Sequence, residues 1–165
     1  RCSSWWIAFL PATEVEIRLD DLSGRQVQDL LAAHLAGMQE NSPPESVYAL
    51  DLSGLLAPSV SVWTAWDSEE LMGIGALKQL SSSTGEIKSM RTDVRHLRKG
   101  VGLALLDHII AVARERGYRR LSLETGSGAE FEPALTLYRK RGFANGEPFG
   151  DYKPTDFNQF LHLDM

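Results

Sequence analysis

The stretch GEIKSMRTDVRHLRKGVGLALL, residues 85–106, combines the features that decide the fold. Residues 86–92 form an alternating run suited to a strand, and Gly100 and Gly102 then precede the apolar pattern of a helix. Glycines let the backbone approach a ligand, while the free N–H groups and positive dipole end of a helix start favour anionic oxygens. The stretch therefore predicts a site for a phosphate-bearing ligand, with an ordinary solvated loop as the alternative.

Two other phosphate-binding motifs are excluded by inspection. A dinucleotide fingerprint needs a third glycine where Leu105 stands, and no Gly-x-x-x-x-Gly-Lys-Ser/Thr run occurs in the chain.

The composition indicates one globular domain. The chain has 165 residues, 43% of them hydrophobic and 24% charged, with a formal net charge of −5. This charge argues against non-specific nucleic-acid binding and suits a cationic partner. The one cysteine, Cys2, rules out an intrachain disulfide and a cysteine cluster for a metal.

The amino end is treated separately. Its apolar run around Trp5 and Trp6 is too short to span a membrane, and the chain starts at Arg1. An artificial extension, a processed end and a shortened signal-like segment are all open explanations. We take residues 1–13 as a peripheral segment and 14–165 as the domain, and expect a cytoplasmic protein without a membrane partner.

The first half predicts a strand, a helix and an antiparallel meander. Residues 14–19 alternate as a half-buried strand does. Ser23 and Gln26 resemble a capping box that opens an amphipathic helix, which ends before Pro43. A short helix at 51–56 and strands at 60–66, 71–80 and 86–92 follow, with short polar turns between the strands.

The second half alternates helices and strands. An apolar stripe from Leu103 to Ala113 predicts a helix that ends at Gly117, and residues 120–125 predict a strand parallel to 86–92. A helix at 130–141 ends at Gly142, a strand begins near 143–144, and residues 158–165 form the last strand.

These motifs resemble those of one family. The glycine turn, followed after one helix and one strand by ALTLYRKRGF at residues 134–143, resembles the GNAT superfamily of acyl-CoA-dependent N-acetyltransferases. The segments 121–125 and 149–152 resemble those of a small bacterial subgroup of uncharacterised acetyltransferases within this superfamily. The resemblance implies a single α/β (α+β) domain: a mixed sheet of six to seven strands, antiparallel in its first half, with a splayed parallel pair at the cofactor site and about four helices.

The resemblance also implies where acetyl-CoA binds. The backbone amides from Lys99 to Ala104 hold the pyrophosphate, and the strand backbone pairs with the pantetheine arm as an added strand does. Leu97 stands where the family has glutamine or arginine, and Phe131 where it often has asparagine. The expected cofactor residues are Met90, Arg91, Thr92, Arg98, Lys99, Gly100, Val101, Gly102, Leu103, Ala104, Phe131, Ala134 and Tyr138.

Two residues are candidates for catalysis. Glu86 has the spacing from Gly100 at which some family members carry a general base, acting directly or through water; a solvated charge at a strand start is the alternative. Tyr138 is the candidate acid toward the departing thiolate, with a core aromatic as the alternative. A backbone N–H near Met90 is expected to polarise the thioester carbonyl.

By resemblance, the acceptor meets the first helix, the loop after it and the late loops. The candidates are His34, Met38, Ser42, Glu45, Ser46, Tyr48, Glu124, Asp151 and Tyr152. Their carboxylates suit a cationic amine, although plain surface polarity is the alternative, and His34 also suits a packed histidine. His96, His108 and His162 lack metal-ligand spacing, so no metal is expected.

The expected function is transfer of an acetyl group from acetyl-CoA to a primary amine of a small molecule or peptide, by direct attack in a ternary complex. A non-catalytic acetyl-CoA-binding or sensing module is the alternative. A homodimer is a possible assembly.

Overall fold

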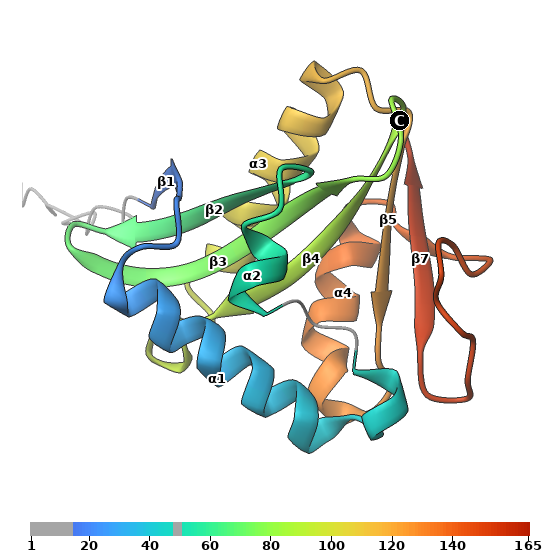
Figure 1. Ribbon diagram of the computed structural model, residues 1–165, viewed down its shortest axis with the longest axis horizontal. Helices are drawn as coiled ribbons and strands as arrows, with labels where there is room; N and C mark the ends of the chain where they lie inside the picture. Colours follow the sequence, from blue (N-terminus) through green and yellow to red (C-terminus); the bar gives the residue numbers. More distant parts are fainter. Residues whose placement is uncertain (1–14, 48–50) are drawn as a thin grey trace, which may run out of the picture.

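The computed structural model describes residues 15–47 and 51–165, and its centre is one mixed sheet with helices on both faces (Figure 1). The strands are β1 (Glu16–Leu19), β2 (Val60–Asp67), β3 (Glu70–Gln79), β4 (Thr84–Thr92), β5 (Arg120–Thr125), β6 (Ala144–Asn145) and β7 (Gln159–Asp164), in the sheet order β1-β2-β3-β4-β5-β7-β6. The helices are α1 (Arg25–Asn41), α2 (Leu52–Leu55), α3 (Val101–Glu115) and α4 (Glu132–Lys140). The predicted mixed sheet with its antiparallel first half is confirmed.

The two faces of the sheet carry separate cores. The core on one face includes Val27, Leu30 and Leu31 of α1 and Leu55 of α2, and Figure 1 shows these two helices together on that face. The core on the other face joins α3 and α4 to the sheet. Burial of apolar surface on both faces fixes the sheet between two layers of helices.

The capping box predicted at Ser23 and Gln26 is wrong. Helix α1 begins after Gly24, which has no side chain to cap the helix. Ser23 instead donates to the Asp21 carboxylate at 2.6 Å, a charged acceptor two residues away. The Gln26 amide donates to the Glu69 carbonyl in the β2–β3 turn and accepts from the Leu71 N–H of β3, both at 3.0 Å, so it ties α1 to that hairpin.

Strand β4 carries a bulge in its second half. Its pairing with β3 shifts between Ile74 and Ala76, so that two residues of β4 oppose Gly75, and Ser89 has a φ of 56°. A bulge of this kind bends a strand and increases its twist. Ser89 is not glycine, so its left-handed backbone stores strain at this point.

Strands β4 and β5 separate after a short parallel contact. They pair only over residues 84–86 and 120–122, and Figure 1 shows the two strands diverging from that end. The predicted splayed parallel pair is therefore confirmed. Because the bulge follows within three residues of the last pair, β4 turns away from β5 and leaves a gap in the sheet.

The C-terminal third differs from the prediction in detail. The helix predicted at 130–141 is a 3₁₀ turn, Ala129–Phe131, followed by α4, whose first turn contains Pro133. Gly117 and Gly142 end α3 and α4 with φ values of 80° and 94°, as predicted. β6 is only two residues long and pairs with β7.

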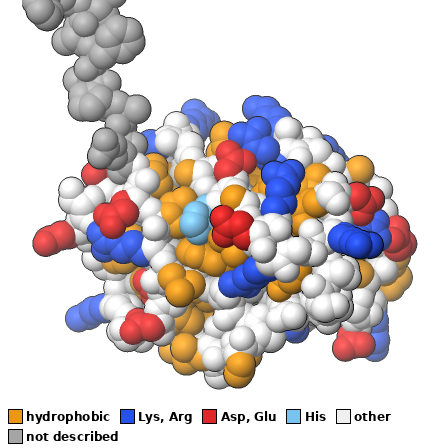
Figure 2. Space-filling view, turned by 90° about the horizontal axis from the view of Figure 1, so that it is seen from above, with side chains coloured by type: hydrophobic (Ala, Val, Ile, Leu, Met, Phe, Trp, Pro, Cys, Tyr) orange, Lys and Arg blue, Asp and Glu red, His pale blue; other side chains and the backbone are white. Residues whose placement is uncertain are grey.

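Figure 2 shows one face, seen from the top edge of Figure 1, on which acidic and basic side chains are interspersed among apolar ones. No single-sign charged surface covers this face. Among the residues that the structure describes, no helix is long and apolar enough to cross a membrane.

Candidate active site

A cavity of about 190 Å³ lies where β4 and β5 diverge. Residues of α1, β4, β5, the 3₁₀ turn Ala129–Phe131 and α4 form its wall, together with Tyr152 from the loop before β7. The lining residues are His34, Met38, Glu86, Ile87, Lys88, Ser89, Met90, Arg91, Leu123, Glu124, Thr125, Glu130, Phe131, Ala134, Tyr138 and Tyr152.

Glu86, Lys88 and Tyr152 form a connected group in this wall. Glu86 and Lys88 are two residues apart on β4, and their charged groups pair at 3.2 Å with both side chains nearly buried. The Tyr152 hydroxyl lies 2.7 Å from the Lys88 Nζ and donates to the Glu86 carboxylate. The Glu86 charge is therefore held by two partners rather than solvated.

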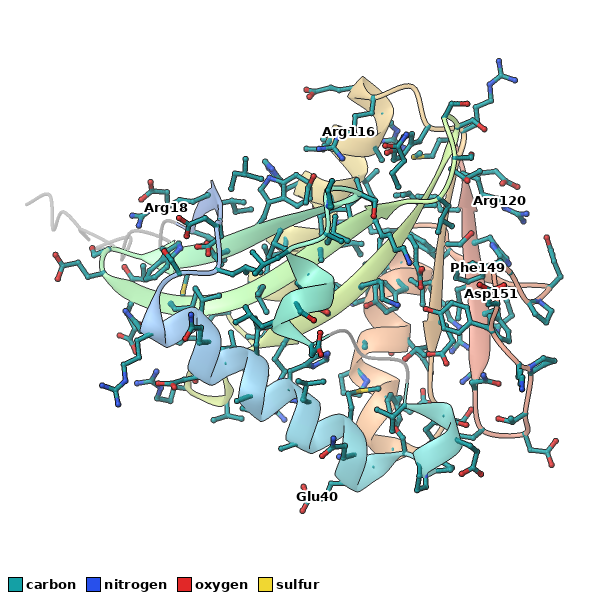
Figure 3. All side chains as sticks on the ribbon, in the orientation of Figure 1. Arg18, Glu40, Arg116, Arg120, Phe149 and Asp151 are labelled. Carbon is teal, nitrogen blue, oxygen red and sulfur yellow. The ribbon has the colours of Figure 1, made fainter. Side chains whose placement is uncertain are left out.

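Tyr152 is held in place by aromatic packing. The Phe149 ring lies edge-on to Tyr152 at 5.1 Å and to Phe160 of β7 at 5.9 Å. Figure 3 labels Phe149 and Asp151 beside β7, on the loop that carries Tyr152. Asp151 itself is exposed and does not line the cavity.

Glu124 is the second carboxylate of the cavity that comes from the sheet. Burial raises its pKa to about 7, and the nearby Glu86 charge adds to this rise, while Asn158 and Lys88 act in the opposite direction. The Asn158 amide is a distant partner, with its Nδ2 at 3.5 Å from the carboxylate. A carboxyl group with this pKa changes its protonation state near neutral pH.

Tyr138 projects from α4 into the same cavity. It is 6% exposed, its ring lies edge-on to Phe143 at 5.8 Å, and burial raises the pKa of its phenol. The hydroxyl makes no hydrogen bond to another described residue. A phenol in this state stays protonated at neutral pH and keeps its hydrogen for donation.

His34 forms part of the wall on the α1 side. Burial and the neighbouring Arg91 charge lower its pKa to about 4, so the imidazole is neutral at pH 7. Its Nδ1 is buried without a hydrogen-bond partner among the described residues. The Ser89 hydroxyl, at the bulge, is buried without such a partner as well.

The predicted pyrophosphate turn sits at the start of α3. Gly100 is the N-cap residue, with a φ of 80°, and no side chain of the described residues caps this helix end. The first N–H groups of α3 are therefore open to an external acceptor. Lys99 turns toward His96, at 3.2 Å from its Nδ1, and Arg98 is exposed. Gly102 leaves room for α4, because a Cβ there would lie 3.3 Å from Leu137.

Ten of the predicted site residues line the cavity: His34, Met38, Glu86, Met90, Arg91, Glu124, Phe131, Ala134, Tyr138 and Tyr152. Ser42 and Ser46 are buried away from it, and Glu45 and Asp151 are exposed. Thr92 and the glycine turn lie beyond it, and Tyr48 lies outside the described residues. None of the described residues form a group of three or more potential metal ligands.

Sequence reasoning missed Lys88, Ser89 and Asn158. The sequence could have indicated Lys88, because residues two apart on a strand share a face and Glu86 was already a candidate. Ser89 had none, since no glycine marks the bulge. Asn158 approaches Glu124 only because β5 and β7 pair, with Thr125 opposite Gln159.

Comparison with known proteins defines the class. Residues 27–143 match the model of the acetyltransferase (GNAT) family. The protein named "Uncharacterized N-acetyltransferase YsnE" of Bacillus subtilis (strain 168) is 56% identical over 138 residues, 84% of this chain and 91% of its own length. "Uncharacterized N-acetyltransferase YedL" of Escherichia coli (strain K12) is 49% identical over 149 residues, 90% of this chain and 94% of its own. The chain belongs to the GNAT acetyltransferase family and is an acyltransferase.

Solved structures share the fold. The putative acyl-CoA N-acyltransferase of Klebsiella pneumoniae is similar with a TM-score of 0.77 and 27% identity, over 92% of this chain and 98% of the other. A GNAT family acetyltransferase of Elizabethkingia anophelis, solved with acetyl-CoA bound, has a TM-score of 0.67 and 20% identity over 92% and 98%.

Proposed function

We propose that this acyltransferase moves an acetyl group from acetyl-CoA to a primary amine by direct attack in a ternary complex. The observation that carries the proposal is the cavity between the diverging ends of β4 and β5, which contains Glu124, Glu86 and Tyr138 together. The acetyl-CoA bound to the Elizabethkingia anophelis protein, which has the same fold, supports the choice of donor.

Acetyl-CoA is expected to lie along β4, with its pyrophosphate at the start of α3. Backbone amides from Lys99 to Ala104 suit the pyrophosphate, because the helix end is uncapped and its dipole favours anions. Among the described residues, no strand pairs with the second half of β4 on the β5 side, so the backbone from Met90 to Thr92 suits the pantetheine arm. The thioester then reaches the cavity.

The amine must lose a proton before or during attack. An aliphatic ammonium has a pKa of about 10 in water. Glu124 suits the role of base, since its pKa of about 7 leaves it charged above neutral pH yet basic enough to accept a proton. Glu86, the base proposed from the sequence, already accepts from Tyr152 and pairs with Lys88, so we assign it an electrostatic role beside Glu124.

Glu124 first takes one proton from the ammonium and later releases it to solvent. The neutral amine nitrogen attacks the thioester carbonyl carbon, the new C–N bond forms, and the C–S bond breaks. Tyr138, whose raised pKa keeps the phenol protonated at neutral pH, donates its proton to the departing thiolate. The second proton that the nitrogen loses as the amide forms restores the Tyr138 phenol. The products are the acetylated amine and CoA.

A thiol-release assay with acetyl-CoA and a panel of primary amines tests this proposal. Turnover is expected on at least one amine, and Tyr138→Phe is expected to lower kcat by about 10²-fold or more, the range for loss of a general acid. Acetyl-CoA binding without turnover on any amine would instead favour the sensing module. Unchanged kcat in Tyr138→Phe with a saturating acceptor would remove the acid role.

A further inference from the structure

Arg91 lines the cavity, and its guanidinium has no anionic partner in the described part of the chain. It makes no ion pair or hydrogen bond with any residue in 15–47 or 51–165, whereas the other lysine or arginine of the cavity wall, Lys88, is paired with Glu86. Arg91 is half-buried. A partly buried cation is stabilised more strongly than an exposed one by a ligand of opposite charge, because water screens their attraction less.

The position of the guanidinium is set by α1. Arg91 lies on β4 opposite Ile74, and its Nη1 is 3.2 Å from the point that a Cβ on Gly37 would occupy. A glycine inside a helix is destabilising relative to alanine, yet here it allows the guanidinium to lie against the helix backbone. α1 therefore holds the cation at the cavity wall.

His34 lies on α1 one helical turn before Gly37, and it is a second polar side chain of the cavity without a partner among the described residues. The side chain is 8% exposed and lines the cavity, its ring is neutral, and its Nδ1 has no partner among the described residues. A buried polar group that lacks a hydrogen bond destabilises the folded protein until a ligand supplies the missing partner. Arg91 and His34 together offer a charged fork and a neutral ring to one ligand group.

The phosphates of acetyl-CoA do not suit this position. They are assigned to the start of α3, and Figure 1 shows α3 on the opposite face of the sheet from α1. Arg91 packs against Gly37 on the α1 face. The group that Arg91 faces is therefore part of the acceptor rather than of the donor.

We propose that Arg91 and His34 bind a carboxylate of the acceptor, so that the acceptor is a small amino acid with its amine directed to Glu124. The guanidinium fork matches a carboxylate with two parallel hydrogen bonds. The charges of the cavity are then complementary at both ends of the acceptor, with carboxylates at the amine and a cation at the carboxylate. This inference rests on the proposed acetyl transfer and adds the acceptor class.

Amino acids and their carboxamides are the probes, because each pair has the same side chain and amine and differs in the one negative charge. The wild-type enzyme is expected to prefer the accepted amino acid over its amide by about 10- to 100-fold in kcat/KM, the size of one hydrogen bond to a charged group. Arg91→Met is expected to reduce this ratio to near one, and Arg91→Lys to retain part of it.

Two further variants test whether the preference for the carboxylate depends on the position of the Arg91 guanidinium. Gly37→Ala adds a methyl group 3.2 Å from the guanidinium without changing any charge, and is expected to lower the preference in part. Arg95→Met removes an exposed arginine that pairs with Asp93 outside the cavity, and is expected to leave the preference intact. Acetyl-CoA calorimetry on each variant checks that it is folded.

The outcomes separate this inference from the proposed function. Turnover of amines with no preference for the carboxylate, or a preference that Arg91→Met leaves unchanged, would overturn the acceptor class alone. If no amine is acetylated, the proposed acetyl transfer is overturned. Calorimetric titration of the amino acids and amides into CoA-saturated protein then still tests the carboxylate site. Binding of an amino acid over its amide that Arg91→Met abolishes supports the carboxylate site, and equal or absent binding overturns it.

Discussion

At the scale of single residues, the cavity gives two similar carboxylates different surroundings. Glu86 is fixed by Lys88 and Tyr152, whereas the one side-chain hydrogen bond of Glu124 to a described residue is the distant Asn158 amide at 3.5 Å, and burial raises the Glu124 pKa to about 7. Separate environments of this kind assign separate roles to two acids in one site. The structure therefore gives a physical reason to consider Glu124 before Glu86 as the base.

The pH profile of kcat/KM tests that assignment. Because the pKa of Glu124 is raised, its carboxyl is protonated and inactive below about pH 7 and charged above it, so activity rises through pH 7. A second rise near pH 10 belongs to the amine itself. Glu124→Gln is expected to remove the first rise and to lower kcat/KM at pH 8 by about 10²-fold or more.

Glu86→Gln is the matched comparison for this profile. It removes a carboxylate from the same cavity, and it is expected to keep the rise near pH 7, shifted to lower pH, because the Glu86 charge helps to raise the pKa of Glu124. Loss of the rise in Glu86→Gln and its retention in Glu124→Gln would return the role of base to Glu86.

At the scale of elements, α3 offers two glycines in the same conformation at its opposite ends. Gly100 and Gly117 both have a φ of 80°, and a Cβ at either would meet nothing within 4 Å. Alanine at either position is expected to cost about 1–2 kcal/mol of unfolding free energy through backbone strain alone. Only Gly100 lies beside the amides assigned to the pyrophosphate.

Gly100→Ala is therefore expected to weaken acetyl-CoA binding severalfold, while Gly117→Ala, with the same strain, leaves it unchanged. Calorimetry for the ligand and chemical denaturation for stability measure the two effects. Equal acetyl-CoA affinities in both variants, at equal stability losses, would contradict the placement of the pyrophosphate at the start of α3.

The elements themselves could be predicted because their signals are local. The spacing of Val27, Leu30 and Leu31 defines α1, and Gly117 and Gly142 mark two helix ends. The prediction of a capping box was wrong because the contacts that decide it are not all local. Its two side chains have better partners outside the helix, and one of these is the β2–β3 turn, which becomes a neighbour only on folding.

At the scale of the whole molecule, the site depends on contacts that no local pattern specifies. Tyr152 reaches Glu86 across 66 positions of sequence, and Arg91 lies against Gly37 because β4 and α1 pack together. The antiparallel meander of β2, β3 and β4 and the parallel β4–β5 pair were predictable from chain connectivity, whereas the position of β7 between β5 and β6 was not. The bulge at Ser89, which opens the cavity, was not, because its residue types are ordinary for a strand.

The proposed acetyl-CoA site consists of the gap between β4 and β5 together with the start of α3. Isothermal titration calorimetry of the wild-type protein with acetyl-CoA, at two temperatures so that a zero enthalpy at one cannot hide binding, tests it most directly. Saturable binding of one acetyl-CoA molecule per chain is the expected result. An absence of heat at both temperatures, with the protein folded, would contradict it.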